Sequence, residues 1–371
     1  MTRRTLAIIA VLFSASLGAA SAAAAPAGGN AAAPKGSEKG VWKFAASGDS
    51  RNCGDVVMPA IAASVRRSGA RFYWHLGDFR RIAGVDEDIQ HQPDHLAKPL
   101  TMPEYEDLAW KDFLKSQIKP FGRLPVYLAR GNHELVPPKT TAEYLARFSR
   151  RLNMRPLRLQ RLRDDPADRK PKPYYHWVAG GVDFITLDNG VGDQFDADQL
   201  AWFEKTLRSD SADTRIHAIV AGMHEALPES ISKDHSMSQS EGGTASGLRA
   251  YEDLLRIQNE NHKRVYVLGS HSHYFMDGIF NTAYWHDHGG VLPGWIVGTA
   301  GAVRYALPAD ANSANAAETN IYGFLTGAVH SDGEIQFDFQ RLNESDVPVA
   351  VKKRYTPEFV HWCFAENSQA H

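Results

Sequence analysis

The chain has 371 residues, of which 43% are hydrophobic and 23% are charged, a composition typical of a globular protein with a sizeable core. Its formal net charge of −2 lacks the strong basic excess that marks many nucleic-acid-binding proteins, so we expect no nucleic-acid partner. The length fits one large domain or two smaller ones.

Residues 1–25 have the pattern of a secretory signal peptide. Two arginines near the start precede an apolar run at residues 6–13, and small residues end in an Ala-Ser-Ala motif at 20–22. This run is too short to span a membrane, and no second apolar stretch reaches that length. Residues 26–40 are rich in Ala, Gly and Pro and indicate a disordered lead-in. The sequence therefore predicts an exported protein, secreted or periplasmic, without a membrane span.

Two cysteines, Cys53 and Cys363, are the only ones in the chain. In an oxidising compartment an even pair of cysteines can form one disulfide bond. The alternative is two unpaired buried thiols, and the sequence leaves both possibilities open.

From residue 41 on, apolar strand-like runs alternate with segments of helical spacing. We expect strands within residues 41–49, 71–78, 124–134, 182–189, 216–225 and 264–273, and a helix at 55–67. Asp196 and Gln199 form a start resembling a capping box for another helix. Residues 322–330 and 333–342 read as a strand pair joined by a Ser-Asp-Gly turn. This alternation predicts a layered α/β fold with both sheet faces covered.

Three long polar segments, residues 80–103, 135–172 and 228–246, interrupt the alternation. Insertions of this length are functional loops or disorder in compact domains. The stretch from Arg147 to Lys172 carries ten Lys and Arg against three Asp. It is either a solvated basic surface or a rim that attracts anionic substrates.

Five of the strand-like runs end in residues of the kinds that bind metals. Strand ends on one edge of an α/β sheet converge on a common crevice. Carboxylates, an amide oxygen and imidazoles gathered there can coordinate divalent cations. The residues at these ends are Asp49, Asp78, Asn132 with His133, His224, and His271 with His273.

Other polar residues have simpler explanations. His75 lies inside a predicted strand and is expected to be a core histidine or a support behind the site. His286, Asp287 and His288 lie outside the ordered set of strand ends. They form either a polar loop or a third metal site.

The ordered set resembles the calcineurin-like metallophosphoesterase superfamily, including its purple-acid-phosphatase-like branch. The most specific piece is Gly-Asn-His-Glu at 131–134, and Gly-Asp at 77–78 and His-Ser-His at 271–273 support it. The resemblance implies a four-layer α/β/β/α sandwich of two facing mixed sheets flanked by helices. It places the catalytic domain at residues 41–345, with residues 346–371 as a C-terminal tail packed on that domain.

The resemblance also implies two divalent metal ions of a kind such as Mn, Fe or Zn. Asp78 would bridge them. Asn132, His224 and His271 would complete one site, and Asp49 and His273 would belong to the other. His133 would face the substrate, with Glu134 orienting it. A metal-activated water would then hydrolyse a phosphate ester.

The chain departs from the family pattern around the first metal site. Many members have Asp-x-His where this chain has Asp49-Ser50-Arg51, and purple acid phosphatases have a Tyr at the position of Arg81. We therefore expect the first ion to bind weakly. Arg51 has no acceptor atom and cannot be a ligand. It is either a bidentate phosphate clamp or a structural partner of Asp49 or another carboxylate.

The leading functional prediction is an exported, metal-dependent phosphoesterase acting on a small phosphorylated substrate. We favour a phosphomonoesterase of the acid-phosphatase type, because Arg51 and Arg81 could grip a dianionic terminal phosphate. The alternatives are a phosphodiesterase or phospholipase-like hydrolase, and a degenerate member that binds phosphorylated ligands without turnover. The sequence does not indicate the oligomeric state.

Overall fold

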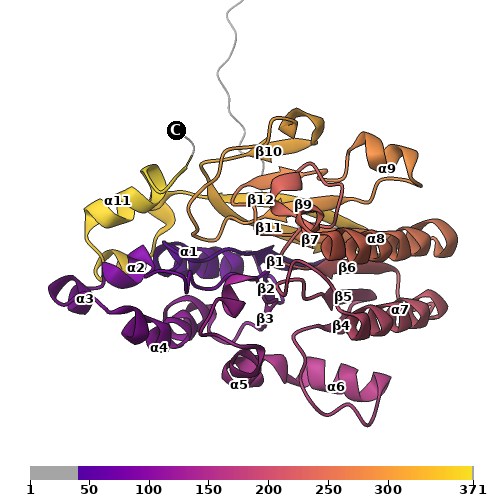
Figure 1. The fold of residues 1–371 in the computed structure, drawn as a ribbon, viewed down its shortest axis with the longest axis horizontal. Helices are drawn as coiled ribbons and strands as arrows, with labels where there is room; N and C mark the ends of the chain where they lie inside the picture. Colours follow the sequence, from indigo (N-terminus) through magenta and orange to yellow (C-terminus); the bar gives the residue numbers. More distant parts are fainter. Residues whose placement is uncertain (1–40, 370–371) are drawn as a thin grey trace, which may run out of the picture. The chain divides into compact units, whose positions relative to one another are not determined.

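Two β-sheets face each other in the computed structural model, which describes residues 41–369 (Figure 1). The predicted signal peptide and lead-in lie outside these residues. The five-stranded sheet has the order β12-β11-β1-β2-β3, and the seven-stranded sheet has the order β10-β8-β9-β7-β6-β5-β4. The strands are β1 (Trp42–Ser47), β2 (Tyr73–His75), β3 (Val126–Leu128), β4 (Tyr175–Ala179), β5 (Val182–Thr186), β6 (Ala218–Gly222), β7 (Arg264–Gly269), β8 (Phe275–Asp277), β9 (Gly294–Val297), β10 (Ala316–Glu318), β11 (Tyr322–Val329) and β12 (Ile335–Leu342).

Helices flank the two sheets, and α7 and α8 lie beside each other along the seven-stranded one (Figure 1). The α-helices are α1 (Gly54–Arg67), α2 (Glu87–Gln90), α3 (Pro93–Ala97), α4 (Met102–Asp112), α5 (Thr141–Leu152), α6 (Arg155–Asp164), α7 (Ala197–Ala212), α8 (Glu241–Asn261), α9 (Ala283–Asp287), α10 (Val349–Lys352) and α11 (Pro357–Ala365). The predicted α/β class, with two facing mixed sheets flanked by helices, is confirmed. None of the helices within residues 41–369 combines the length and the apolar composition needed to cross a bilayer.

The strand directions bring the predicted site residues to one edge. In the five-stranded sheet β1, β2 and β3 run parallel, and in the seven-stranded sheet β5, β6 and β7 run parallel. The loops at the carboxyl ends of such strands meet at a common edge. Asp49, Asp78 and Asn132 follow β1, β2 and β3, whereas His224 and His271 follow β6 and β7.

The core forms because the central strands bury both faces. In β5, Phe184 points between the sheets, and its ring centroid lies 5.0 Å from that of Phe44 in β1. Its neighbour Ile185 points the other way, into a second cluster with Phe203 of α7 and Leu254 of α8. Each fully buried side chain of this size contributes roughly 1.5–3 kcal/mol of hydrophobic free energy. The two clusters make the sheets a rigid support for the loops at their edge.

The expectation of a loop at residues 135–172 is wrong for its central part, which forms α5 and α6. Helix α5 begins with a capping box, in which the Thr140 side chain accepts from the backbone of Glu143 and the Glu143 carboxylate accepts from the backbone of Thr140. Tyr144, Phe148 and Leu152 recur every four residues and are buried. Twelve residues with this spacing bury one face although the other face is basic.

The predicted start of α7 is partly confirmed. Asp196 is its N-cap, and its side chain accepts a hydrogen bond of 2.7 Å from the backbone of Gln199. The Gln199 side chain does not close a capping box, because it donates to the carbonyl of Asp188 and accepts from the same residue's backbone N–H.

A disulfide bond joins Cys53 to Cys363, which settles the choice that the sequence left open. Cys53 caps the start of α1, and Cys363 lies in α11. The hydroxyl of Tyr355, which precedes α11, also donates to the Asp55 carboxylate at 3.0 Å. The C-terminal segment is therefore held against the helix that follows the Asp49 loop.

Candidate metal centre

The loops after β2 and β3 approach each other so closely that only glycine fits at two positions. A Cβ at Gly77, whose φ is +99°, would lie 2.7 Å from the backbone nitrogen of Gly131. A Cβ at Gly131 would lie 2.3 Å from the Asp78 carboxylate. The Gly-Asp and Gly-Asn pairs of the sequence are therefore a packing requirement that places Asp78 beside Asn132.

Three of the predicted ligands have left-handed backbone conformations. The φ angles of Asp49, Asp78 and His271 are 61°, 58° and 63°. Such conformations cost on the order of 1–3 kcal/mol for a non-glycine residue, and they concentrate at functional sites where the surrounding fold enforces them.

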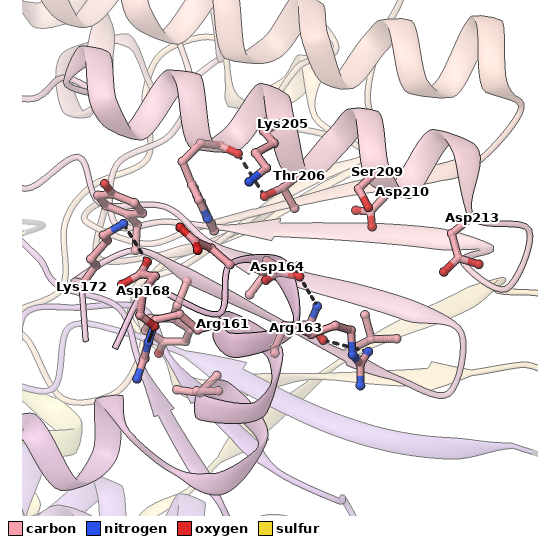
Figure 2. A pocket seen from close by; sticks show the side chains of 18 of the residues that line it. Arg161, Arg163, Asp164, Asp168, Lys172, Lys205, Thr206, Ser209, Asp210 and Asp213 are labelled. Atoms are coloured by element: carbon pink, nitrogen blue, oxygen red, sulfur yellow. Dashed lines mark hydrogen bonds and ion pairs between the residues drawn. The ribbon is translucent and has the colours of Figure 1, made fainter. Parts of the chain in front are cut away.

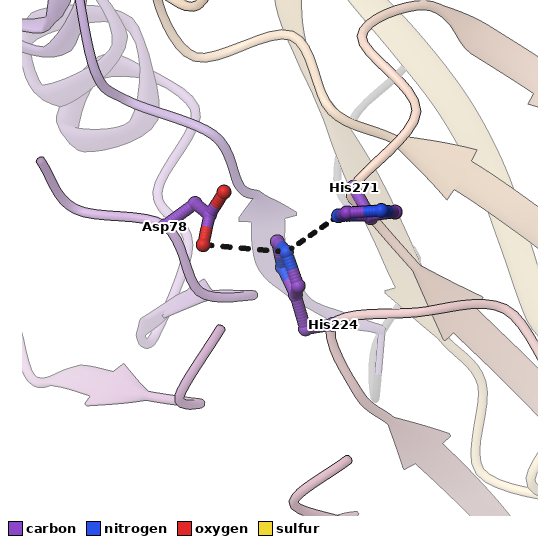
Figure 3. A group of neighbouring side chains, drawn as sticks. All are labelled: Asp78, His224 and His271. Carbon is purple, nitrogen blue, oxygen red and sulfur yellow. Dashed lines mark hydrogen bonds and ion pairs between the residues drawn. The ribbon is translucent and has the colours of Figure 1, made fainter. Parts of the chain in front are cut away.

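Four donor atoms converge around His224, as Figure 3 shows for three of the residues. His224 Nε2 lies 3.3 Å from Asp78 Oδ1, 3.1 Å from Asn132 Oδ1 and 3.0 Å from His271 Nδ1. Asp78, His224 and His271 form a group with the proximity of metal ligands within residues 41–369. The structure thus brings together all four residues predicted for one metal site.

The tautomer of His224 leaves a lone pair in this cluster. Its Nδ1 donates to the Leu76 carbonyl at 3.0 Å, and a carbonyl only accepts. In the neutral ring Nε2 is then an acceptor, facing the carboxylate and amide oxygens of Asp78 and Asn132. Ligands bonded to a small cation at about 2.0–2.1 Å lie roughly 3.0–3.4 Å apart. The four donors therefore fit a divalent cation in chemistry and in spacing.

The charged groups of the cluster also stabilise positive charge at its centre. Burial disfavours charge on His224, but Asp78 and Asp49 outweigh it and raise the pKa of His224 to about 10. Burial opposes ionisation of Asp78, yet His224 and His133 hold the pKa of Asp78 well below its usual value. Burial and the neighbouring His224 lower the pKa of His271. The carboxylates around His224 therefore stabilise one added positive charge, either a proton on its ring or a metal ion in its place.

The remaining predicted ligands, Asp49 and His273, lie next to the guanidinium of Arg51. Asp49 Oδ1 is 3.2 Å from His273 Nε2, and Asp49 Oδ2 accepts from the Ser270 hydroxyl and from the His271 backbone. Arg51 Nη2 lies 2.9 Å from the same His273 Nε2. The structure therefore gathers the first predicted ligand set, but with a side-chain cation among its atoms.

The ion pair of Arg51 is with Asp78, whose Oδ2 lies 3.7 Å from Arg51 Nε. Of the two predicted structural partners, Asp49 or another carboxylate, the ion pairs of the described residues thus contain the second. Arg81, the second predicted substrate-binding arginine, has a side chain that is 46% exposed and lies 3.6 Å from Glu87. Its contact with substrate stays a prediction.

Both ring nitrogens of His133 have protein partners. Nδ1 donates to the Arg81 carbonyl, and Nε2 accepts from Arg51 Nη1. We expected Glu134 to orient this ring, but the hydrogen bonds of the described residues do not include that contact. The buried Glu134 carboxylate instead accepts from the backbone N–H groups of Asp78, Phe79 and Gly131, at 2.8–2.9 Å. Glu134 therefore fixes the two loops that carry Asp78 and Asn132, and acts on His133 only through the backbone.

Sequence reasoning missed two residues next to Arg51 and Asp49. The Tyr305 ring stacks on His273 with centroids 3.9 Å apart, and its hydroxyl lies 3.5 Å from Arg51 Nη2. Ser270, the residue before His271, donates its hydroxyl to the Asp49 carboxylate. Tyr305 lies in an irregular segment after β9, where no periodic pattern marks it.

The two doubtful groups of histidines have structural explanations. His75 is fully buried, its Nε2 lies 2.8 Å from the Ser50 hydroxyl, and burial lowers its pKa to about 3. His286 bonds Asn281 at 2.8 Å, and His288 donates to the Tyr284 carbonyl at 2.7 Å. No group with ligand proximity forms around His286 in the described part of the chain. His286 and Asp287 lie in the short helix α9 and not in the expected polar loop.

A separate hollow of about 570 Å³ lies between α6, β4 and α7. Figure 2 shows Lys205, Thr206, Ser209 and Asp210 along α7 on one wall and Asp164 and Asp168 across from them. None of the residues predicted for the metal centre lines it. The basic stretch of the sequence thus borders a hollow that also contains many carboxylates.

Comparison of the sequence with known protein families assigns the chain to one of them. The family described as calcineurin-like phosphoesterase matches residues 61–275, more than half of the chain. That range contains the predicted ligands from Asp78 to His273, whereas Asp49 and Arg51 precede it. Curated protein sequences give no match.

Two solved structures show weak similarity. A structure of PhoD has a TM-score of 0.49 and 14% identity, with 83% of this chain and 72% of that chain covered. An enoyl-CoA hydrotase/isomerase family protein from Silicibacter pomeroyi has a TM-score of 0.17 and 17% identity, with 26% and 43% covered. Neither similarity contributes to the assignment.

Proposed function

Because the chain belongs to the calcineurin-like phosphoesterase family and is a metal-dependent phosphoric ester hydrolase, we propose that it hydrolyses small phosphomonoesters outside the cytoplasm. The observation that carries this proposal is the convergence of four lone-pair donors, from Asp78, Asn132, His224 and His271, at strand ends of the two sheets. The same proposal places the chain in the purple-acid-phosphatase-like branch of the family.

These four residues are the proposed ligands of a divalent cation. When bound, such an ion activates water as a nucleophile and neutralises charge on the phosphoryl oxygens. The family resemblance implies a second ion beside the first. The polypeptide itself contributes the rigid placement of the ligands, through the His224–Leu76 hydrogen bond and through the three backbone bonds of Glu134.

Charge near the centre supports a preference for monoesters. Burial opposes the charge on Arg51, but Asp78 and Asp49 raise its pKa above the ordinary value, so this cation is permanent. The exposed Arg81 adds a second guanidinium on the loop after Asp78. A terminal phosphate carries one more negative charge than a diester and gains more from both. His133, held by Arg51, lies at this side of the centre and is proposed to contact the substrate.

The disulfide supports export. Bonds such as Cys53–Cys363 form and persist in oxidising compartments and are rare in the cytosol. This fits the predicted signal peptide at residues 1–25, so we propose a secreted or periplasmic location. The catalytic domain is proposed to extend over residues 41–345, with the C-terminal segment covalently attached to it.

The test is a hydrolysis panel with chelated and metal-supplemented protein. We expect metal-dependent release of p-nitrophenol from p-nitrophenyl phosphate and a lower kcat/KM for bis(p-nitrophenyl) phosphate. Asp78→Asn should abolish turnover, with His286→Ala as an exposed control. Full activity after chelation would refute the metal centre. Preference for the diester would favour the phosphodiesterase alternative, and metal binding without any turnover would favour the degenerate one.

A further inference from the structure

The guanidinium of Arg51 occupies the space between the atoms that were predicted to bind the first metal ion. Its Nη2 lies 2.9 Å from His273 Nε2, and its Nε lies 3.7 Å from Asp78 Oδ2. The arginine side chain is only 10% exposed. The position of a long cationic side chain buried in this way is determined by its contacts with the protein and not by hydration.

The contact with His273 excludes a metal ion from the same nitrogen. His273 Nδ1 donates to the Val303 carbonyl at 2.6 Å, so in the neutral ring Nε2 carries the only lone pair. That lone pair accepts the N–H of Arg51. A metal bonded to Nε2 would lie about 2.0–2.1 Å along the same direction. The arginine nitrogen at 2.9 Å and such an ion therefore cannot be present together.

A second imidazole fixes the other end of the guanidinium. His133 Nδ1 donates to the Arg81 carbonyl, so its Nε2 is likewise an acceptor, and it receives Arg51 Nη1. The Tyr305 hydroxyl lies 3.5 Å from Nη2. Arg51 is thus held between the ring nitrogens of two histidines, each of which bonds a backbone carbonyl through its other nitrogen.

The other ligand set has no such cation. Among the hydrogen bonds and ion pairs of residues 41–369, no Lys or Arg reaches the side chains of Asn132, His224 or His271. Their lone pairs face one another, with Asp78 Oδ1 as the fourth donor. The two halves of the predicted dinuclear site therefore differ: within residues 41–369 no Lys or Arg side chain reaches Asn132, His224 or His271, whereas Arg51 lies among the residues of the other half.

We propose that this chain binds a single divalent ion, at Asp78, Asn132, His224 and His271, and that the Arg51 guanidinium takes the place of the second. The inference rests on the proposed function. Asp78 then bridges the ion through Oδ1 and the guanidinium through Oδ2. Arg51 supplies a fixed positive charge beside the ion, and its buried Nε, which has no hydrogen-bond partner among the described atoms, lies 3.7 Å from Asp78 Oδ2. The sequence predicted a weakly bound ion at the first metal site, and we now expect that site to bind no ion.

The experiment measures metal stoichiometry. The purified full chain is loaded with excess Mn(II), freed of unbound ion by gel filtration, and analysed for manganese and protein by elemental analysis. We expect one ion per chain, and an electron paramagnetic resonance spectrum of an isolated Mn(II). Two ions per chain with a spin-coupled spectrum would overturn the proposal while leaving the proposed function intact. No bound ion would overturn the proposed function itself, and with it this inference.

The variant Arg51→His tests whether removal of the guanidinium allows a second ion to bind. It removes the guanidinium and supplies an imidazole where many family members have one, so the stoichiometry should rise from one ion to two, with a coupled spectrum. Arg208→His is the matched control, because it makes the same substitution at an arginine of α7 whose side chain is 70% exposed, and it should keep one ion. One ion in a folded Arg51→His variant would overturn the claim that Arg51 fills a metal position. The wild-type stoichiometry decides between one ion and two even where the variant does not fold.

Discussion

The guanidinium of Arg80 donates a hydrogen bond of 2.8 Å to the carboxylate of Asp88, and neither side chain has any exposed surface. Asp55 and Asp112 accept from the same guanidinium, and Asp86 lies 3.8 Å from it. Burial raises the pKa of Asp55 to about 6 even though Arg80 opposes this. One arginine therefore holds several buried carboxylates together, directly behind the loop that carries Asp78.

Replacing Arg80 by Leu should destabilise the fold strongly. The carboxylates would remain buried without their cation, and breaking a buried ion pair in this way costs about 3–5 kcal/mol. Urea unfolding measures the difference. Arg208→Leu is the control, because its side chain is 70% exposed and its loss should change the free energy of unfolding by less than about 0.5 kcal/mol. Equal stability of the two variants would show that the cluster does not stabilise the fold.

His133→Ala should lower kcat without removing metal. A positioned histidine contributes roughly 10²–10⁴-fold to turnover, and none of the four proposed ligand atoms belongs to His133. Its Nε2 lies 3.8 Å from the nearer Asp78 oxygen. Kinetics on p-nitrophenyl phosphate and elemental analysis of the same preparation check both statements. A variant that loses its metal together with its activity would make His133 a ligand and contradict this assignment.

The disulfide should be detectable and stabilising. Alkylation of the unfolded, non-reduced protein should label no thiol, because both cysteines are bonded. Because the two cysteines have a sequence separation of 310, the chain-entropy view allows on the order of 5 kcal/mol. The double variant Cys53→Ala/Cys363→Ala should therefore have a clearly lower Tm than wild type. An unchanged Tm would mean that non-covalent contacts such as the Tyr355–Asp55 hydrogen bond hold the C-terminal segment without the disulfide.

His176 makes stability depend on pH. It bonds Asp183 at 2.6 Å and Asp164 at 2.8 Å. Burial lowers its pKa, but these carboxylates outweigh burial and raise the pKa of His176 to about 10. Because the folded pKa exceeds the unfolded value of about 6.5, this stabilisation is complete below pH 6.5 and is lost as the pH rises towards 10.

The measurement compares wild type with His176→Gln by urea unfolding between pH 6.5 and 10. The free energy of unfolding should differ most at pH 6.5, and the two curves should converge as the pH rises. The pKa of Asp210 in α7 is raised to about 9 by burial and by Asp183. This carboxyl group therefore also lowers the free energy of unfolding of both proteins as the pH rises. Because His176 itself lowers the pKa of Asp210, the difference between the curves reports the histidine together with its effect on Asp210, and parallel curves would contradict the assigned pKa.

The strand ends were predictable because an apolar run that stops at a polar residue is a local pattern. Asp78, Asn132 and His224 each follow such a run, and parallel strands bring their ends together whatever the loops contain. Helix α5 was missed for the opposite reason. Its apolar residues Tyr144 and Phe148 recur every four positions, but arginines around them obscure the spacing.

The position of Arg51 could not be predicted in the same way. The sequence places it after Asp49, but its direction depends on His133 and His273, which lie 82 and 222 residues away. Tyr305 packs there from a loop after β9. Such contacts depend on how separate segments fold together, so a pattern along the chain indicates the residue types at a site more readily than their orientation.

The pairing of β1 with β11 makes the first strand of the described chain depend on one of its last. Trp42 lies opposite Val329 in this antiparallel pair, and β2 covers the other edge of β1. A chain that emerges N-terminal end first therefore exposes one open edge of β1 until β11 is available. Exposed strand edges pair readily with other chains. Truncation before β11 should thus produce aggregation and not merely a smaller enzyme, and the Asp49 loop that follows β1 cannot be fully assembled before nearly the whole chain has been released.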